Sequence, residues 1–310
     1  MVTLGPRTTA DEVAALYGQD LPQKTIIVTG ANGGIGREAA RVLVRHGARV
    51  ILACRNLTAA NEAVAAFKVE GSAGQAIAMK LDLSDFGSVH AFVQEFEATG
   101  WPLHILINNA GIMALPELTL SKEGTELQFQ TNHLGHFLLA NLLAPILIKS
   151  APSRIVSVSS IAHRRSGIRF NDLNFSEGYD KWTAYGQAKT ANILFAIHAN
   201  KLLSSKGVEV FSLHPGGIMT DLQEHLPKEE QIAMGWITPE GVLHSMFKTI
   251  PQGASTHLVA ALSPELKGHG GAYMEDCVIT ETTTPESKDP VAAKMLWALS
   301  EEKVGHQFAY

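Results

Sequence analysis

The hydrophobic residues of this chain fall into short apolar runs separated by longer mixed stretches. Runs such as IIVT, VILA, HILI and RIVSV are apolar throughout, which is typical of strands buried on both faces of a parallel sheet. Helical patterns fill the stretches between them. We predict strands over 24–30, 49–54, 75–83, 103–108, 154–159 and 208–213, and helices over 34–46, 59–70, 85–98, 122–150 and 183–205. The expected fold is α/β, a doubly wound parallel sheet with helices on both faces.

No shift in composition and no linker divides the chain. We therefore predict a single domain over 24–310, preceded by an N-terminal extension over 1–23. The alternation breaks at 216–251, where prolines, Trp236 and charged residues are mixed. An irregular insertion of this length is more often functional than disordered, so we predict a substrate lid over 216–251.

The 310 residues carry a net charge of −5, with 45% apolar and 18% charged residues. These values are those of an ordinary globular protein and favour neither nucleic acid nor an anionic membrane as a partner. Two cysteines cannot form a disulfide framework. Residues 1–20 hold acidic side chains and no continuous apolar stretch, so we expect no secretory signal and no N-terminal membrane anchor. The apolar stretch 134–148 is too interrupted for a membrane span, and we expect a soluble, cytoplasmic protein.

A glycine-rich turn, T-G-A-N-G-G-I-G over 29–36, follows the first predicted strand and opens the first predicted helix. At such a place the backbone N–H groups and the helix macrodipole favour a diphosphate. The first glycine permits the turn, the second lets backbone approach phosphate, and the third lets helix pack on strand. A tight turn without a ligand is the alternative. We predict a Rossmann-type dinucleotide site that includes Gly30, Asn32, Gly34, Ile35 and Gly36.

The end of the second predicted strand distinguishes the two nicotinamide dinucleotides. An acid there would accept from the adenosine 2′-hydroxyl of NAD, but residues 53–56 read A-C-R-N. Arg55 suits a 2′-phosphate instead, so we predict NADP(H) in preference to NAD(H). A solvated charge at a strand end is the alternative for Arg55. Asp82 and Leu83 close the third predicted strand, where Asp82 would accept from the adenine amino group or cap the next helix.

Tyr185 and Lys189 lie four residues apart on one predicted helix, so their side chains share a face. Taken alone, such a pair is ordinarily an exposed helix face. Its companions change that interpretation, because they lie at the ends of predicted strands or, in the case of Asn132, inside the helix after one. They would meet at the carboxyl edge of the sheet, where open α/β folds bind ligands. These companions are Asn132, Ser160, the N-N-A-G run at 108–111 and the P-G-G-I-M-T run at 215–220.

Together these motifs resemble the short-chain dehydrogenase/reductase family, from about Lys24 to Tyr273. The combination of T-G-x-x-x-G-I-G, N-N-A-G, the helix Asn, the strand Ser, Y-x-x-x-K and P-G-x-I-x-T carries the resemblance. Longer sequence runs are similar to the branch that holds retinol dehydrogenases and the WW-domain-containing oxidoreductase. These runs are L-A-C-R-N at 52–56, T-N-H-L-G-H-F at 131–137 and V-S-S-I-A-H at 158–163. No WW module is visible in the sequence.

The resemblance implies a role for each residue. Tyr185 would be the general acid that protonates a carbonyl oxygen, or the base in the oxidative direction. A free phenol has a pKa near 10, and we expect the Lys189 ammonium to lower it by roughly 1–3 units while also reaching the nicotinamide ribose. Ser160 would hold the substrate oxygen, and Asn132 would order a water that links Lys189 to solvent. The nicotinamide half of the coenzyme would contact Tyr185, Lys189, Asn109, Ala110, Gly111, Pro215, Gly216, Ile218 and Thr220.

We therefore expect an NADP(H)-dependent oxidoreductase that interconverts a ketone or aldehyde and an alcohol on a medium-sized apolar substrate. The alternatives are a tailoring short-chain reductase of secondary metabolism and a catalytically silent NADP(H)-binding regulator. His133 and His136 are three residues apart but lack a third ligand, so we expect no metal. By resemblance, a homodimer or homotetramer paired through the two long helices is expected.

Overall fold

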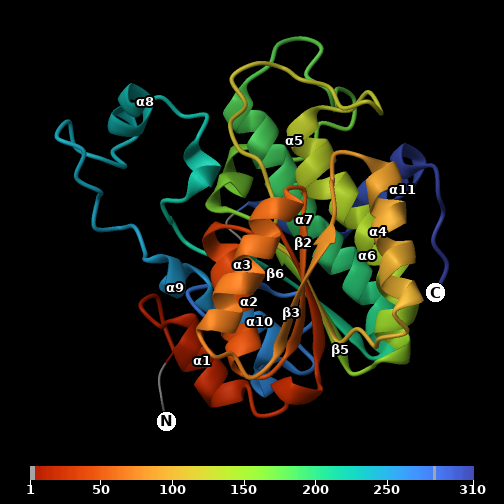
Figure 1. Ribbon diagram of the computed structural model, residues 1–310. Coiled ribbons are helices and arrows are strands. Elements are labelled where there is room, and N and C mark those ends of the chain that lie inside the picture. The colour runs from red at the N-terminus through yellow and green to blue at the C-terminus, as the bar shows by residue number, and fades with distance from the viewer. Residues whose placement is uncertain (1–3, 282–283) are drawn as a thin grey trace.

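A computed structural model describes residues 4–281 and 284–310 of the chain. An eight-stranded sheet in the order β3-β2-β1-β4-β5-β6-β7-β8 forms its centre (Figure 1). Every neighbouring pair is parallel except β7 and β8, which are antiparallel. The predicted doubly wound parallel sheet is thereby confirmed. The strands are β1 (Thr25–Thr29), β2 (Arg49–Cys54), β3 (Gln75–Lys80), β4 (Ile105–Asn108), β5 (Ser153–Val158), β6 (Val208–His214), β7 (Tyr273–Glu275) and β8 (Val278–Ile279).

Helices cover both faces of this sheet, because its strands present apolar side chains on both sides. In β1, Ile26 and Val28 face one hydrophobic core, and Ile27 faces the other. The first core is completed by α1 (Ala10–Tyr17), α2 (Gly34–Arg45), α3 (Leu57–Val69) and α10 (Ser255–Leu262). The second is completed by α4 (Phe86–Ala98), α6 (Gly135–Lys149), α7 (Lys181–Leu203) and α11 (Pro290–Val304).

The prediction of a long helix over 122–150 is wrong for its first residues. The helical segment begins with α5 (Leu127–Phe129), because the Glu126 carboxylate accepts hydrogen bonds from the N–H groups of Gln128 and Phe129 and so caps this end. A π-helical turn, Gln130–Leu134, then leads into α6. Single π turns of this kind are frequent at functional sites. By length and composition alone Leu127–Lys149 could cross a membrane, but 72% of its most apolar part is buried inside the fold.

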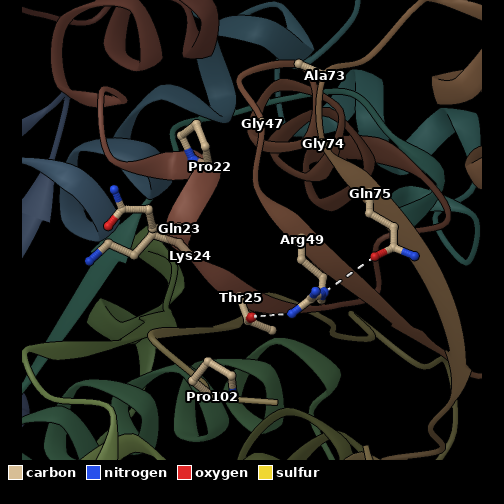
Figure 2. Close-up of a pocket in the computed structure, with 10 residues that line it drawn as sticks. All are labelled: Pro22, Gln23, Lys24, Thr25, Gly47, Arg49, Ala73, Gly74, Gln75 and Pro102. Atoms are coloured by element: carbon tan, nitrogen blue, oxygen red, sulfur yellow. Dashed lines mark hydrogen bonds between the residues drawn. The ribbon is translucent and has the colours of Figure 1, made fainter.

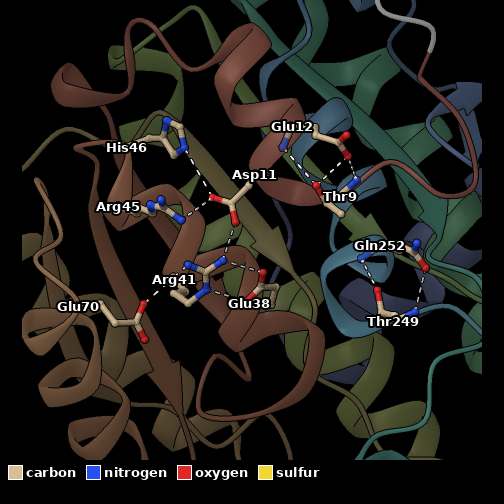
Figure 3. A network of polar contacts seen from close by, with 10 residues as sticks. All are labelled: Thr9, Asp11, Glu12, Glu38, Arg41, Arg45, His46, Glu70, Thr249 and Gln252. Carbon is tan, nitrogen blue, oxygen red and sulfur yellow. Dashed lines mark hydrogen bonds and ion pairs between the residues drawn. The ribbon is translucent and has the colours of Figure 1, made fainter.

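The predicted N-terminal extension contributes to the first core through α1, whose Ala10, Val13 and Ala14 are almost fully buried. Polar contacts hold this helix against α2 (Figure 3). The Asp11 carboxylate accepts from Arg41 Nη2 at 2.8 Å and lies 3.4 Å from Arg45 Nη1. Residues before α1 also reach the lid, since the Arg7 guanidinium donates to backbone oxygens at 245 and 247.

Beyond the sixth strand, the sequence pattern did not predict the elements that complete the fold. They are α9 (Ile250–Gly253), α10, β7, β8 and α11. Helix α11 packs against α7, and its Trp297 lies in an aromatic cluster with Phe137 of α6 and Phe195 of α7. Phe308 packs on the same Phe137 ring at 5.9 Å between centroids. The C-terminal segment therefore covers part of the two long helices.

The predicted lid (216–251) is irregular apart from a short 3-10 helix (Asp221–Gln223), α8 (Lys228–Ala233) and the start of α9. It extends to one side of the molecule, beside the upper ends of the strands in Figure 1. Its two ends lie side by side, because Lys248 N–H donates to Gly217 O at 2.8 Å and an isolated parallel bridge joins Ile218 to Lys248.

Candidate active site

The glycine-rich turn at the end of β1 packs tightly against the loop that follows β4. Gly30 and Gly34 have left-handed φ values of 66° and 52°, which favour glycine. A Cβ on Gly36 would lie 2.4 Å from Asn109 Nδ2 and 2.6 Å from Gly30 O, so no larger residue fits there. Helix α2 begins at Gly34 and points its N-terminus at this turn. The turn is thus closely packed, and the binding of a diphosphate by its backbone stays a prediction.

Thr29, which precedes this turn, links the predicted coenzyme and catalytic segments. Its hydroxyl accepts from the N–H groups of Asn109 and Ala110, both at 2.9 Å, and lies 2.8 Å from His136 Nε2. His136 Nδ1 in turn lies 3.1 Å from Asn132 O, which can only accept. The imidazole therefore carries its proton on Nδ1, and Thr29 donates to Nε2. Burial lowers the pKa of His136 to about 4 and keeps the ring neutral.

Asn132 lies in the π-helical turn and is completely buried. Its amide forms two hydrogen bonds with Ile112, accepting from the N–H at 2.8 Å and donating to the carbonyl at 2.9 Å. A Cβ on Gly111 would lie 3.1 Å from Asn132 Oδ1 and 3.6 Å from Lys189 Nζ. Gly111 therefore lies next to both predicted catalytic side chains.

Tyr185 and Lys189 lie in the first half of α7 and are both buried. Lys189 Nζ donates to Val158 O at 3.0 Å and lies 5.5 Å from the centroid of the Tyr185 ring. The Lys189 carbonyl accepts from Ser159 Oγ at 2.7 Å, so the end of β5 holds this part of α7 at two points. Ser160 caps the turn after β5, where its hydroxyl accepts from Ala162 N–H at 3.1 Å. The four predicted catalytic side chains thus lie along one edge of the sheet.

The prediction that the pKa of Tyr185 is lowered is wrong. Burial raises the pKa of Tyr185 to about 12, and only hydrogen bonding with Ser160 acts in the opposite direction. Burial also lowers the pKa of Lys189 to about 8. The physical reason is that desolvation disfavours the charged form of both groups, and the ammonium of Lys189 is directed at the Val158 carbonyl. Sequence spacing places the pair together but does not reveal the removal of water around it.

The lid covers the tyrosine with apolar side chains. Leu226 and Trp236 of the lid pack in one cluster with Trp182 and Tyr185, leaving Tyr185 only 4% exposed. The Glu230 carboxylate in α8 accepts from Lys181 Nζ at 2.6 Å and from Trp182 Nε1 at 2.9 Å. These contacts fasten the lid to the start of α7. The Trp236 ring also lies 5.9 Å from that of Phe247, near the end of the lid.

The residues predicted to recognise the adenosine end lie at the ends of β2 and β3. Arg55 is exposed, and its guanidinium forms no ion pair within the part of the chain that the structure describes. Asp82 accepts from Ser84 N–H at 3.0 Å and from Ser84 Oγ at 2.6 Å. The alternative role for Asp82 as the helix cap is wrong, since Asp85 caps α4. Leu83 is buried, and its carbonyl lies against Gly135.

The loop after β6 approaches the glycine turn from the other side. A Cβ on Gly34 would lie 3.3 Å from Thr220 Cγ2, which places Thr220 directly beside the turn. Gly216 has φ 102°, and Ile218 is buried against Gly253. The predicted coenzyme residues from the ends of β1, β4 and β6 therefore surround one region. Asn32 and Ile35 belong to the glycine turn itself.

A separate cavity of about 320 Å³ lies at the opposite edge of the sheet, where β1, β2 and β3 begin (Figure 2). Arg49 points into it, with its guanidinium 3.4 Å from both Thr25 Oγ1 and Gln75 Oε1. Its lining includes none of the predicted site residues. In the described residues no group of three His, Cys, Asp or Glu side chains could hold a metal ion. His133 instead lies 2.8 Å from Ser300 Oγ.

Known proteins are similar to this chain over most of its length. The family described as short chain dehydrogenase matches residues 24–231. Retinol dehydrogenase 12 of Mus musculus is 39% identical to this chain, over 93% of this chain and 88% of the relative. The WW domain-containing oxidoreductase of Homo sapiens is 41% identical, over 97% of this chain and 73% of the relative.

Solved structures give the same result. A putative uncharacterized protein from Mycobacterium Paratuberculosis superimposes with a TM-score of 0.71 at 33% identity, covering 93% of this chain and 96% of that one. A short-chain type dehydrogenase/reductase from Mycobacterium marinum, with a TM-score of 0.64 and 21% identity, shares the fold over 82% of this chain and 95% of that one. The chain belongs to the short-chain dehydrogenase/reductase family, as its motifs predict.

Proposed function

We propose that this protein is an NADP(H)-dependent oxidoreductase that interconverts a ketone or aldehyde and an alcohol on a medium-sized apolar substrate. Membership of its family makes it an oxidoreductase with a nicotinamide cofactor. The observation that carries the finer proposal is the position of Gly111. It lies next to both Asn132 and Lys189, in the loop that packs on the glycine turn through Asn109. The coenzyme segments and the proton-transfer residues therefore share one edge of the sheet.

The residues present fit a nicotinamide dinucleotide. The turn at 30–36 offers backbone N–H groups and a helix N-terminus for the diphosphate. The loops at 109–111 and 215–220 would border the nicotinamide half, and Asp82 and Leu83 the adenine. When bound, this cofactor supplies or accepts a hydride at the carbonyl carbon.

The preference for the phosphorylated cofactor is supported by Arg55. It is an exposed guanidinium at the end of β2, where no acid stands to bind a 2′-hydroxyl. A guanidinium pairs with a phosphate through parallel hydrogen bonds, and among the described residues that of Arg55 has no ion pair to break first.

Proton transfer in this proposal uses the raised pKa of Tyr185. A phenol with a pKa of about 12 is protonated at neutral pH, which is the form that a general acid needs. Tyr185 would donate its proton to the carbonyl oxygen as the hydride reaches the carbon, while Ser160 holds the same oxygen. Lys189, with a pKa of about 8, is suited to return a proton to the phenolate, and Asn132 would connect it to solvent through a water.

The apolar substrate is supported by the walls above Tyr185. Met113, Ala162, Leu226 and Trp236 lie in the cluster that covers the phenol. A substrate that replaced the lid side chains there would contact mainly apolar and aromatic groups.

The test is the Tyr185→Phe variant, assayed for NADPH oxidation with a panel of ketones and aldehydes. We expect kcat to fall by roughly 10²–10⁴-fold, because the proton donor is lost, while NADPH affinity changes only a few-fold. Comparable turnover in the variant would refute this mechanism. A wild-type protein that binds NADPH but turns over no member of the panel would instead support the silent regulator.

A further inference from the structure

Lys248, near the end of the lid, is a buried lysine that the proposed chemistry does not use. Its side chain is only 6% exposed, which is rare for this residue type. The ammonium is paired with the Asp276 carboxylate, at the turn between β7 and β8. A charge of this kind is kept in a buried position only when a specific partner compensates it.

The aliphatic part of Lys248 lies against Gly216, the second residue after β6. A Cβ on Gly216 would lie 2.8 Å from Lys248 Cε and 2.9 Å from Lys248 Cδ. With φ 102°, Gly216 also has a backbone conformation that other residues rarely adopt. The backbone of Lys248 adds a second contact, since its N–H donates to Gly217 O at 2.8 Å. Lys248 therefore holds this loop by its main chain and by its side chain.

Asp276 is itself held from outside the lid. It and Cys277 have left-handed φ values of 51° and 68°, as in a two-residue hairpin turn. The Cys277 N–H donates to Thr256 Oγ1 at 3.2 Å, and the thiol donates to Ser255 Oγ at 3.1 Å, both in α10. Helix α10 thus fixes the turn, the turn fixes Asp276, and Asp276 fixes Lys248.

We propose that Lys248 is a positioning residue for the nicotinamide end of the coenzyme, which it serves by clamping the 216–218 loop between the lid and the β7–β8 turn. This inference rests on the proposed function, in which Gly216 and Ile218 border the nicotinamide. A lysine meets both requirements of the clamp, because its methylene groups pack on Gly216 and its ammonium reaches Asp276. Loss of the ammonium frees the loop and weakens binding of the nicotinamide half only.

The experiment uses the full-length Lys248→Met variant, which keeps an unbranched chain over Gly216 and removes the charge. Direct titration should show that its Kd for NADPH rises about tenfold, equivalent to 1.4 kcal/mol. Its Kd for adenosine 2′,5′-bisphosphate, which lacks the nicotinamide, should stay at the wild-type value. KM for NADPH should rise with Kd, while kcat at saturating coenzyme changes little.

Asp276→Asn provides an independent variant, and we expect the same selective loss. The double variant should bind no more weakly than the worse single one, because both remove one interaction. Lys248→Arg should restore most of the affinity, and Lys228→Met, at an exposed lid lysine, is the matched control without effect.

Equal NADPH affinity in Lys248→Met and the wild type would overturn the inference. An equal loss of affinity for NADPH and for adenosine 2′,5′-bisphosphate would also overturn it, because it would indicate a general loosening of the fold. The proposed function itself is tested separately, on the wild-type protein. It would be overturned if the wild type bound no nicotinamide dinucleotide.

Discussion

At the scale of single residues, hydrogen bonds between distant parts of the chain set the positions of the reactive groups. The hydroxyl of Thr29 joins the end of β1 to the loop after β4 and, through His136, to the carbonyl of Asn132. A small change at this hydroxyl should therefore affect both the glycine-rich turn and Asn132. Burial then sets the protonation of Tyr185 and Lys189.

In the proposed function, coenzyme preference depends on the side chain of Arg55. Arg55→Ala should raise KM for NADPH by roughly 10–100-fold, because a charge-assisted contact with the 2′-phosphate is lost. KM for NADH, which lacks this phosphate, should stay within about twofold. Initial rates with both coenzymes against one ketone measure the difference. An equal rise for both would contradict the assignment to NADP(H).

The sequence predicts candidate site residues by type and spacing, but it does not reveal their surroundings. Tyr185 and Lys189 share a helix face, as their four-residue spacing predicts. The direction of the tyrosine pKa shift is wrong, because the expectation counted the neighbouring charge and not the lost solvent. Thr29 and His136 were missed as supporting residues, since their hydrogen bond joins positions 107 residues apart. The only signal was that each belongs to a recognised motif, Thr29 to the run at 29–36 and His136 to the run at 131–137.

At the scale of elements, the lid is attached to α7 through α8. Glu230 accepts two hydrogen bonds from the first residues of α7, and the Trp182 ring lies 6.0 Å from that of Trp236 in the lid. Tyr185 is shielded by this arrangement. In the proposed function, a substrate would therefore displace lid side chains before it reaches the phenol.

Removing this attachment should open the lid. In Glu230→Ala, the loss of two partly exposed hydrogen bonds is worth about 1 kcal/mol, which raises the open fraction about fivefold. We expect faster limited proteolysis within the lid and a shift of tryptophan emission to longer wavelength. Glu229→Ala, at the neighbouring exposed acid, is the matched control. Identical proteolysis of Glu230→Ala and the wild type would show that the lid is held by apolar packing alone.

The predicted elements are accurate where the pattern is strong. Strand β2 matches its predicted bounds, because a fully buried apolar run has distinct ends. The helix predicted from 122 begins at Leu127, because the polar residues before it form a turn closed by Glu126. Helices α10 and α11 and the short strands β7 and β8 were not predicted. Their apolar residues pack on elements far away in the sequence, and no local hydrophobic periodicity predicts them.

At the scale of the whole molecule, one hydrophobic core lies on each face of the sheet, and the interior holds several uncharged histidines. Burial lowers the pKa of His133 and His214 to about 3, and that of His136 and His257 to about 4. Each group has a folded pKa below its unfolded value near 6.5. The unfolded chain therefore binds more protons between these values, and stability that is present above pH 6.5 is lost as the pH falls toward 4.

This linkage predicts acid-sensitive folding. Each such histidine removes about 1.4 kcal/mol of unfolding free energy per pH unit between its two pKa values. Urea unfolding at pH 7, 6 and 5 should show a steep decline. His257→Leu should flatten the decline, because this completely buried ring would no longer take up a proton on unfolding. His306→Leu, at an exposed position, should leave the slope unchanged, and an unaltered slope in His257→Leu would contradict the argument.

The adjacent ends of the lid have a consequence for the diversity of relatives. Since Gly217 and Lys248 are hydrogen-bonded neighbours, the chain between them leaves the sheet and returns to almost the same point. The entropic cost of closing such a loop grows only slowly with its length. Segments of different size and composition can therefore be exchanged at this junction while the dinucleotide frame beneath stays intact. One scaffold could in this way acquire new specificities through transplanted surface loops.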